Sequence, residues 1–132
     1  MSKTSELLRP KMIQFTLPLP PSMNSIWRGK AKGVYRSAEY IQWIIVAGNM
    51  LKTYRIKPVK PPYVVDYQFG RKITKKGVVS KARMDVANRE KALSDLLQKM
   101  GVIEDDCMID DMRLRWSEDV APSMVRVSVG TL

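Results

Sequence analysis

The stretch DVANREKALSDLLQKMGVIEDD, residues 85–106, decides how the rest of the sequence is interpreted. Its apolar residues recur at helical spacing, which predicts a helix from about Val86 to Met100. Gly101 is expected to end this helix, because glycine readily adopts the left-handed conformation. A helix of about 15 residues is roughly 22 Å long. The chain must therefore turn back along it before Asp105 or Asp106 can approach Asp85. The expected buried stripe of the helix comprises Val86, Leu93, Leu96, Leu97 and Met100.

Working outward from this helix, the sequence predicts one more helix and four strands. Ser37 is the expected N-cap of a helix over 38–54, and strands are expected over 12–17, 63–69, 108–116 and 123–129. Residues 22–36 are expected to form a loop or ribbon, and 70–83 a basic loop. Glu118 and Asp119 are expected to cap a hairpin between the last two strands. The buried face of the first helix is expected to comprise Tyr40, Trp43, Ile44, Ala47, Met50 and Leu51.

This order, β-α-β-α-β-β, predicts a single α/β (α+β) domain over residues 11–132, with two helices packed on a mixed sheet. Residues 1–10 are expected to be a flexible leader. The chain has 132 residues, of which 45% are hydrophobic and 27% charged, and this is globular composition. The longest apolar run, residues 44–47, is far too short to span a membrane. No secretory signal is visible, so a cytoplasmic protein is expected.

Histidine and cysteine counts exclude several chemistries. The chain has no histidine, which excludes a histidine general base, a His-ligated zinc site and a Ser-His-Asp triad. Its single cysteine, Cys107, cannot form an internal disulfide, which favours a reducing compartment. We expect Cys107 to be a small buried apolar side chain.

The net charge of +10 is unevenly distributed. Residues 1–84 contain 17 Lys and Arg against 3 Asp and Glu, whereas residues 85–132 contain 6 against 10. A basic region attracts nucleic acid through counterion release. Without a strongly amphipathic basic helix a membrane surface is disfavoured, and surface lysines that serve only solubility explain the charge equally well. The candidate phosphate contacts are Arg28, Lys30, Lys32, Arg36, Arg71, Lys72, Lys75, Lys76, Lys81 and Arg83.

Acidic residues stand out against this basic background at Asp85 and at Asp105 and Asp106. Converging carboxylates suit a hard divalent cation such as Mg²⁺, which can activate water beside a phosphate. Each residue also has a simpler interpretation. Asp85 suits a helix N-cap, the Asp pair suits a solvated turn, and Lys91 suits an ion pair with Asp95 one helical turn away.

The order of these features resembles the RusA family of Holliday-junction resolvases. The stretch LPLPPSMN, residues 17–24, is similar to the family's Pro-Pro-Ser-x-Asn signature. A basic stretch then precedes Asp85-Val86-Ala87-Asn88, with Lys91 shortly after, and Gly101 leads to Asp105 and Asp106. The resemblance covers residues 12–129.

The resemblance implies an Mg²⁺-dependent homodimer, bacterial or phage-encoded, that cuts four-way DNA junctions by paired symmetric nicks. It places Asp85 and Asp106 at the metal, Asp105 beside them as a helper, and Lys91 at the phosphate as the catalytic lysine. Asn88 belongs to the same helix-start motif. A two-fold dimer would place one active site on each of two strands of a two-fold junction.

The sequence departs from the family pattern at Ala87, where the family has a second aspartate of the metal site. Alanine offers no ligand oxygen, so cleavage is expected to be impaired while DNA binding survives. Two explanations compete: an aspartate replaced to inactivate the enzyme, which the otherwise intact motif favours, or a natural member that binds without cutting. The alternative function is therefore a non-catalytic junction-binding or DNA-binding accessory protein. A module that binds no nucleic acid is the weakest interpretation.

Overall fold

The computed structural model describes residues 12–22, 27–30, 33–80 and 86–132, with the backbone alone described in 27–30 and 33–36. Several predictions fall outside these residues. They concern the leader over 1–10 and the site residues Lys32, Lys81, Arg83 and Asp85.

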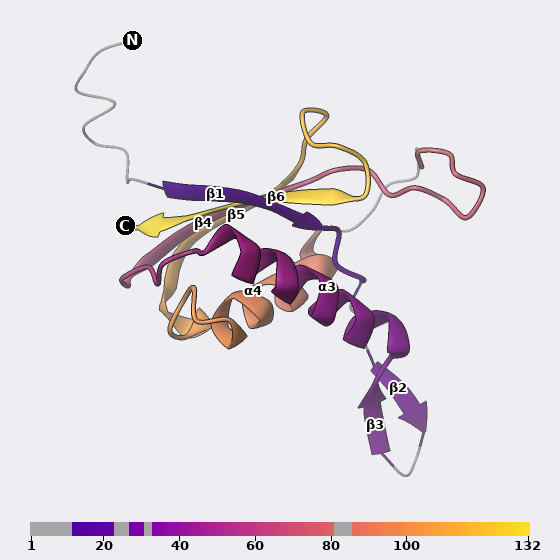
Figure 1. The fold of residues 1–132 in the computed structure, drawn as a ribbon, viewed down its shortest axis with the longest axis horizontal. Helices are drawn as coiled ribbons and strands as arrows, with labels where there is room; N and C mark the ends of the chain where they lie inside the picture. Colours follow the sequence, from indigo (N-terminus) through magenta and orange to yellow (C-terminus); the bar gives the residue numbers. More distant parts are fainter. Residues whose placement is uncertain (1–11, 23–26, 31–32, 81–85) are drawn as a thin grey trace.

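The described residues form a four-stranded sheet, two α-helices and a separate two-stranded hairpin (Figure 1). The elements in chain order are β1 (Met12–Pro18), β2 (Trp27–Lys30), β3 (Gly33–Arg36), α3 (Ala38–Tyr54), β4 (Tyr63–Phe69), α4 (Ala87–Lys99), the 3₁₀ helix η1 (Asp106–Met108), β5 (Ile109–Trp116) and β6 (Met124–Thr131). The predicted order of strands and helices in the main domain is confirmed. The expected loop or ribbon over 22–36 contains the antiparallel β2–β3 hairpin, which projects beyond the two helices.

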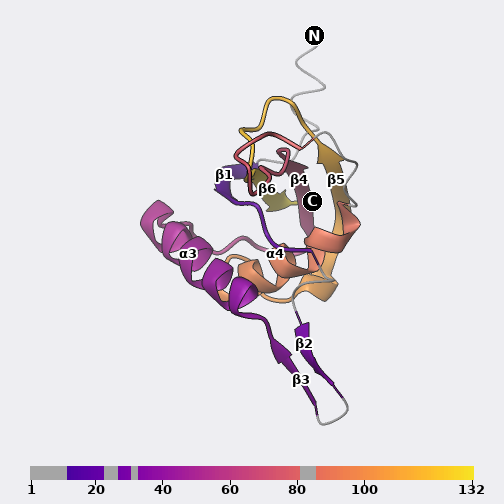
Figure 2. The same cartoon turned by 90° about the vertical axis from the view of Figure 1, so that its right-hand side faces the viewer.

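The sheet is mixed, with strand order β1-β6-β4-β5. Only β4 and β5 are parallel, while β6 pairs antiparallel with both β1 and β4. Helices α3 and α4 lie on the same face of this sheet (Figure 2). Alternate residues of the strands point toward the helices, and these side chains form the core. Those buried almost completely include Leu17, Tyr63, Tyr67, Phe69, Val125, Val127 and Val129.

The ends of both helices follow the local chemistry of the sequence. The Ser37 hydroxyl accepts a hydrogen bond from the Tyr40 backbone N–H, as expected for the N-cap of α3. Gly101 has a φ of +77°, the left-handed conformation expected after α4. The expected buried stripes are largely confirmed, since Tyr40, Trp43, Ala47 and Leu51 are buried on α3 and Leu93, Leu96 and Leu97 on α4. Ile44, Met50, Val86 and Met100 are partly buried against the core.

The connection between β5 and β6 corrects one prediction. These strands do not form a hairpin, because β4 lies between them and the connection crosses the end of β4. The crossing is close, since a Cβ atom on Gly70 would lie 2.2 Å from the Ala121 carbonyl oxygen. Glu118 and Asp119 therefore belong to a crossover and cap no hairpin. The local sequence indicates a turn between β5 and β6. It carries no information about whether another strand, here β4, lies between them in the sheet.

Candidate active site

Helix α4 places Ala87, Lys91 and Asp95 along one stripe, because residues four apart lie on the same helix face. The Lys91 Nζ atom is 3.0 Å from Asp95 Oδ1 and 3.0 Å from Asp106 Oδ2. The first contact is the pair expected within the helix. The second joins α4 to η1 across 15 residues of sequence. The structure thus brings together two predicted catalytic residues, Lys91 and Asp106, and adds Asp95.

One backbone hydrogen bond holds the acidic turn against α4, and a second closes the turn on itself. The Asp106 N–H donates to Gln98 Oε1 at 3.0 Å, and the Cys107 N–H donates to Asp105 Oδ1 at 3.0 Å. Asp105 thereby caps η1 as its N-cap residue. The chain makes the return after Gly101 that the sequence required, and it meets the helix at Lys91. Sequence reasoning missed Gln98, although it lies one helical turn after Ser94 and Asp95 on the side of Lys91.

Electrostatics at this turn follow from these contacts. Hydrogen bonds to Asp106 and Asp95 raise the pKa of Lys91, so its ammonium group stays charged. The hydrogen bonds that Asp105 accepts at Cys107 lower the pKa of the Asp105 carboxyl. Interaction with Asp105 raises the pKa of the Cys107 thiol. Cys107 is exposed, so the expectation of a buried apolar side chain is wrong. The short turn that binds α4 through its backbone leaves this side chain in solvent.

A series of hydrogen bonds between side chains connects α4 to the core. The Tyr67 hydroxyl of β4 lies 3.0 Å from Ser94 Oγ, and the Ser94 hydroxyl donates to the Glu90 carboxylate. Burial raises the pKa of Tyr67, so its hydroxyl stays protonated. Because Ser94 gives its hydroxyl hydrogen to Glu90, the Tyr67 hydroxyl is the donor in its contact with Ser94. Glu90 is therefore fixed beside Lys91 by a buried neighbour. The only part of this hydrogen-bond series that the sequence indicates is the pairing of Glu90 with Ser94, which lie four residues apart.

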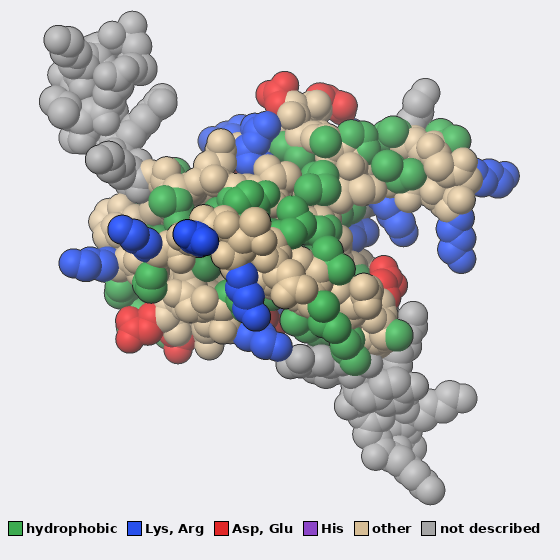
Figure 3. Space-filling model, viewed as in Figure 1, with side chains coloured by type: hydrophobic (Ala, Val, Ile, Leu, Met, Phe, Trp, Pro, Cys, Tyr) green, Lys and Arg blue, Asp and Glu red, His purple; other side chains and the backbone are tan. Residues whose placement is uncertain are grey.

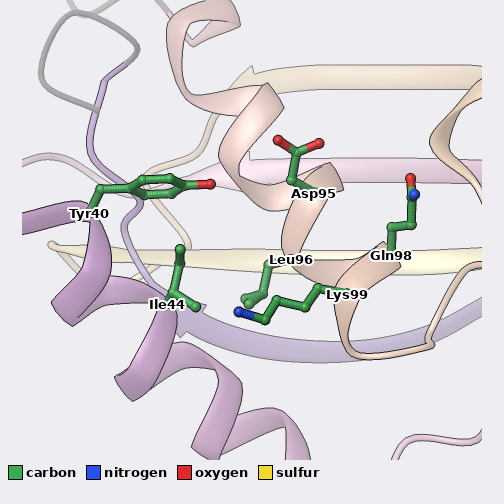
Figure 4. Close-up of a pocket in the computed structure, with 6 residues that line it drawn as sticks. All are labelled: Tyr40, Ile44, Asp95, Leu96, Gln98 and Lys99. Carbon is green, nitrogen blue, oxygen red and sulfur yellow. The ribbon is translucent and has the colours of Figure 1, made fainter. Parts of the chain in front are cut away.

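A hollow of about 400 Å³ separates α3 from α4 beside this site (Figure 4). Tyr40 and Ile44 line it from α3, with the Tyr40 hydroxyl pointing toward α4. Asp95 and Gln98 line it from α4. Asp95 also contacts Lys91, and Gln98 accepts the hydrogen bond from the Asp106 N–H. The hollow therefore shares Asp95 and Gln98 with the candidate site.

The carboxylates at this site are the right kind of ligand for a hard divalent cation, but the described residues supply too few of them. Asp106 and Asp95 offer carboxylate oxygens, the ligands that Mg²⁺ takes. Within the parts of the chain that the structure describes, no three His, Cys, Asp or Glu side chains are grouped to hold a metal ion. Asp85 lies outside those parts, and Ala87 has no ligand oxygen. The candidate helix-start residue Asn88 is half-buried at the beginning of α4.

The candidate phosphate contacts fall in two segments. Arg28, Lys30 and Arg36 lie on the projecting β2–β3 hairpin. Lys72, Lys75 and Lys76 are exposed in the segment after β4, and Lys and Arg side chains are spread over the face shown in Figure 3. Arg71 differs, because its guanidinium stacks 5.2 Å from the centre of the Trp116 ring and lies 3.7 Å from a Glu118 oxygen.

These observations define a small, basic α+β protein with a lysine–carboxylate site between a helix and the turn that follows it. A family model described as Endodeoxyribonuclease RusA matches residues 18–129, and the chain therefore belongs to this family. Membership implies the nuclease activity of a Holliday-junction resolvase, and the family is generally dependent on a divalent metal ion and acts on branched DNA. None of the curated proteins matches the sequence. No described helix is long and apolar enough to cross a membrane.

Proposed function

We propose that the active form of this protein is an Mg²⁺-dependent homodimer that resolves four-way DNA junctions by paired symmetric nicks, and that Ala87 impairs cleavage by this chain. The observation that supports the site most directly is the position of Lys91 Nζ, 3.0 Å from carboxylate oxygens of both Asp95 and Asp106. The motif residues of α4 and of the acidic turn thus meet at one point.

Each residue at this point has a distinct role in the proposal. Asp85 and Asp106 would hold Mg²⁺, with Asp105 as a helper, and the ion when bound supplies Lewis-acid activation of water and of the scissile phosphate. Lys91 remains protonated because two carboxylates hold its ammonium group, so it can stabilise negative charge that develops on the phosphate. Asn88 lies one turn before Lys91 and would orient the substrate strand at the start of α4.

Position 87 decides the activity of this chain. Ala87 is exposed at the first residue of α4, four residues before Lys91, so an aspartate there has room beside the lysine. Alanine leaves the metal one carboxylate short, which weakens its binding and misplaces the attacking water. Removing a negative charge near the DNA leaves binding intact or strengthens it.

The test is cleavage of a synthetic four-way junction in Mg²⁺ by the unaltered chain and by Ala87→Asp, with Ala87→Asn as the matched control of similar size. Gel-shift binding is measured on the same samples in EDTA. We expect only Ala87→Asp to cut and all three to bind. Cleavage by the unaltered chain at the rate of Ala87→Asp would contradict the impairment.

The missing carboxylate at position 87 also favours a second function, a junction-binding protein that does not cut. Under this alternative all three proteins bind the junction and none of them cuts, whatever the Mg²⁺ concentration. The homodimer is tested separately by light scattering, which gives the molar mass of the unaltered chain with and without the junction. A monomer that binds one arm would contradict the paired nicks.

A further inference from the structure

The segment after β4 folds into a short hairpin, the basic ribbon (residues 72–80), which projects from the end of the sheet (Figure 1). Its two arms meet at an antiparallel bridge between Ile73 and Val79. Closer to the tip, the Thr74 N–H donates to the Val78 carbonyl oxygen at 2.8 Å. The backbone of the ribbon is therefore held by its own hydrogen bonds.

Further hydrogen bonds fix the base of the ribbon. The Ser80 N–H donates to the Lys72 carbonyl oxygen at 2.7 Å and closes the base. The Ile73 N–H donates to the Ser123 hydroxyl at 3.3 Å, in the crossover just before β6. The Ser123 N–H in turn donates to the Arg71 carbonyl oxygen at 2.7 Å. The crossover thus supports the ribbon and sets the direction in which its tip points.

The ribbon exposes three apolar residues. Val78 is 61% exposed, the highest fraction among the large hydrophobic residues that the structure describes, and Val79 and Ile73 are 43% and 41% exposed. Ile73 and Val79 lie opposite each other, so their side chains share one face of the ribbon. Single exposed apolar residues are common on protein surfaces, but three that cluster on a projecting hairpin indicate a surface that a ligand covers.

The charges of the ribbon define the chemistry of that ligand. Lys72, Lys75 and Lys76 are exposed among the apolar residues, and Figure 3 shows hydrophobic and basic side chains together on this projection. The sequence has no Asp or Glu between Asp66 and Asp85. The matching ligand therefore combines negative charge with apolar surface. Nucleic acid does so through its phosphates and the faces of its bases, and an anionic lipid surface is the other candidate.

The position of the ribbon favours DNA. Its first residues, Lys72 and Ile73, line a hollow together with Arg89 from the first turn of α4. The same turn carries Ala87 and Asn88 of the candidate active site. Because a strand advances about 3.3 Å per residue, the tip of the ribbon lies no more than roughly 13 Å from its base. DNA that reaches the start of α4 therefore comes within reach of the ribbon.

We propose that the apolar side chains of the basic ribbon pack against unstacked bases at the branch point of the junction, while its lysines bind the flanking phosphates. This inference rests on the proposed function, because it takes branched DNA to be the substrate. Apolar side chains can insert between bases only at the cost of unstacking them. At a branch point stacking is already interrupted, so this cost is smaller there than in a continuous duplex. The ribbon would thus favour branched DNA without reading its sequence.

The first measurement follows the methyl NMR signals of Val78 and Val79 in the unaltered chain, in EDTA. The chain is titrated with a four-way junction, with a duplex of the same arm sequence, and with phosphatidylglycerol vesicles. We expect the junction to shift both signals more than the duplex does. Signals that the duplex moves equally, or that only the vesicles move, overturn the inference. Because this measurement needs no substitution, it stays decisive if a variant fails to fold.

The second measurement is the affinity of the double variant Val78→Ser, Val79→Ser for the junction and for the duplex. Losing the burial of two valines should weaken junction binding by about tenfold and leave duplex binding nearly unchanged. The slope of log K against log salt should stay the same, because no charge is altered. The matched control is Met12→Ser, Leu132→Ser, which removes two exposed apolar residues at the opposite end of the sheet and should change neither affinity (Figure 1).

The outcomes separate this inference from the proposed function. A folded double variant that keeps the full preference for the junction contradicts the inference and leaves the proposed function standing. A loss of junction affinity with a changed salt slope assigns the effect to displaced lysines, and it also contradicts packing on bases. An unaltered chain that binds no DNA at all contradicts the proposed function itself.

Discussion

Lys91 joins two segments of the chain, because its ammonium group contacts carboxylates on both α4 and η1. Two carboxylates around one ammonium leave a net negative charge at this point. Asp106 is the more enclosed of the two acids, with a side chain 28% exposed against 43% for Asp95. The arrangement keeps Asp106 fixed in position while the region stays open to solvent.

Replacing Lys91 by methionine should lower the stability of the domain modestly. Because Lys91 is about half exposed, solvent screening limits the loss to about 0.5–1 kcal/mol, or roughly 2–5 °C in Tm. The folded-state pKa of Lys91 is raised, so its contribution is fully present below about pH 10.4 and is lost only as the pH rises further. Thermal melts from pH 6 to pH 10 should show a constant difference. A difference that closes by pH 8 would contradict this account.

The same substitution should have a much larger effect on cleavage. In the Ala87→Asp protein, Lys91→Met should reduce single-turnover cutting of a four-way junction by about 100-fold or more, the usual cost of losing one group that stabilises transition-state charge. Junction affinity should change little, because one exposed lysine is a small part of a highly basic surface. Lys57→Met, at an exposed lysine after α3, serves as the matched control, and equal rates in both variants would exclude this role for Lys91.

At the scale of residues, the sequence predicted contacts between residues of one helix, but it did not predict contacts between different elements. The Lys91–Asp95 pair follows from their separation by four residues. Gln98 and the buried Tyr67 partner of Ser94 could not be foreseen, because both contacts depend on how η1 and β4 pack against α4. Arg89 is buried on α4, and the one sequence signal for its burial is its position four residues before Leu93 on the apolar stripe.

At the scale of elements, the helices were predicted nearly to the residue because their end signals are local. Ser37 and Gly101 act within one turn of the chain, and each has the conformation that its chemistry requires. Strand pairing is a long-range property, and the expected hairpin after β5 failed for that reason. The crossover places the Ala121 carbonyl oxygen directly over Gly70.

Gly70→Ala should therefore destabilise the domain by about 1–3 kcal/mol, the usual cost of overpacking, because backbone must move to admit the methyl group. Gly48→Ala is the matched control. Its Cβ would lie 3.5 Å from the Met100 sulfur, an ordinary contact, and alanine is the better helix former by about 1 kcal/mol. Denaturant unfolding should show a loss in Gly70→Ala and a gain in Gly48→Ala. Equal stability of the two variants would show that the crossover yields easily.

At the scale of the whole molecule, basic and acidic residues occupy different parts of the fold. The β2–β3 hairpin and the segment after β4 carry candidate phosphate contacts, whereas many of the acids lie in η1 and next to it. Charge arithmetic along the sequence predicted this division, but it could not show that one basic group stands on a projecting hairpin (Figure 1).

If the hairpin contacts DNA, replacing both Arg28 and Lys30 by glutamine should weaken junction binding and make it less sensitive to salt. The slope of log K against log salt should fall by about 0.9 for each phosphate that is no longer neutralised, or about 1.8 in total. Lys52 and Lys57, exposed at and after the end of α3, provide a control with the same change of charge. Equal slopes for the two double variants would assign the hairpin no specific role.

The central position of β6 has a consequence for the newly made chain. This strand contains residues 124–131, yet it lies between β1 and β4 and pairs with both, so that Met12 is opposite Gly130. While the ribosome is still adding the residues before β6, neither β1 nor β4 has its antiparallel partner. The sheet can close only after the last of these strands emerges. Until then the apolar sides of β1 and β4 are available to chaperones or to aggregation.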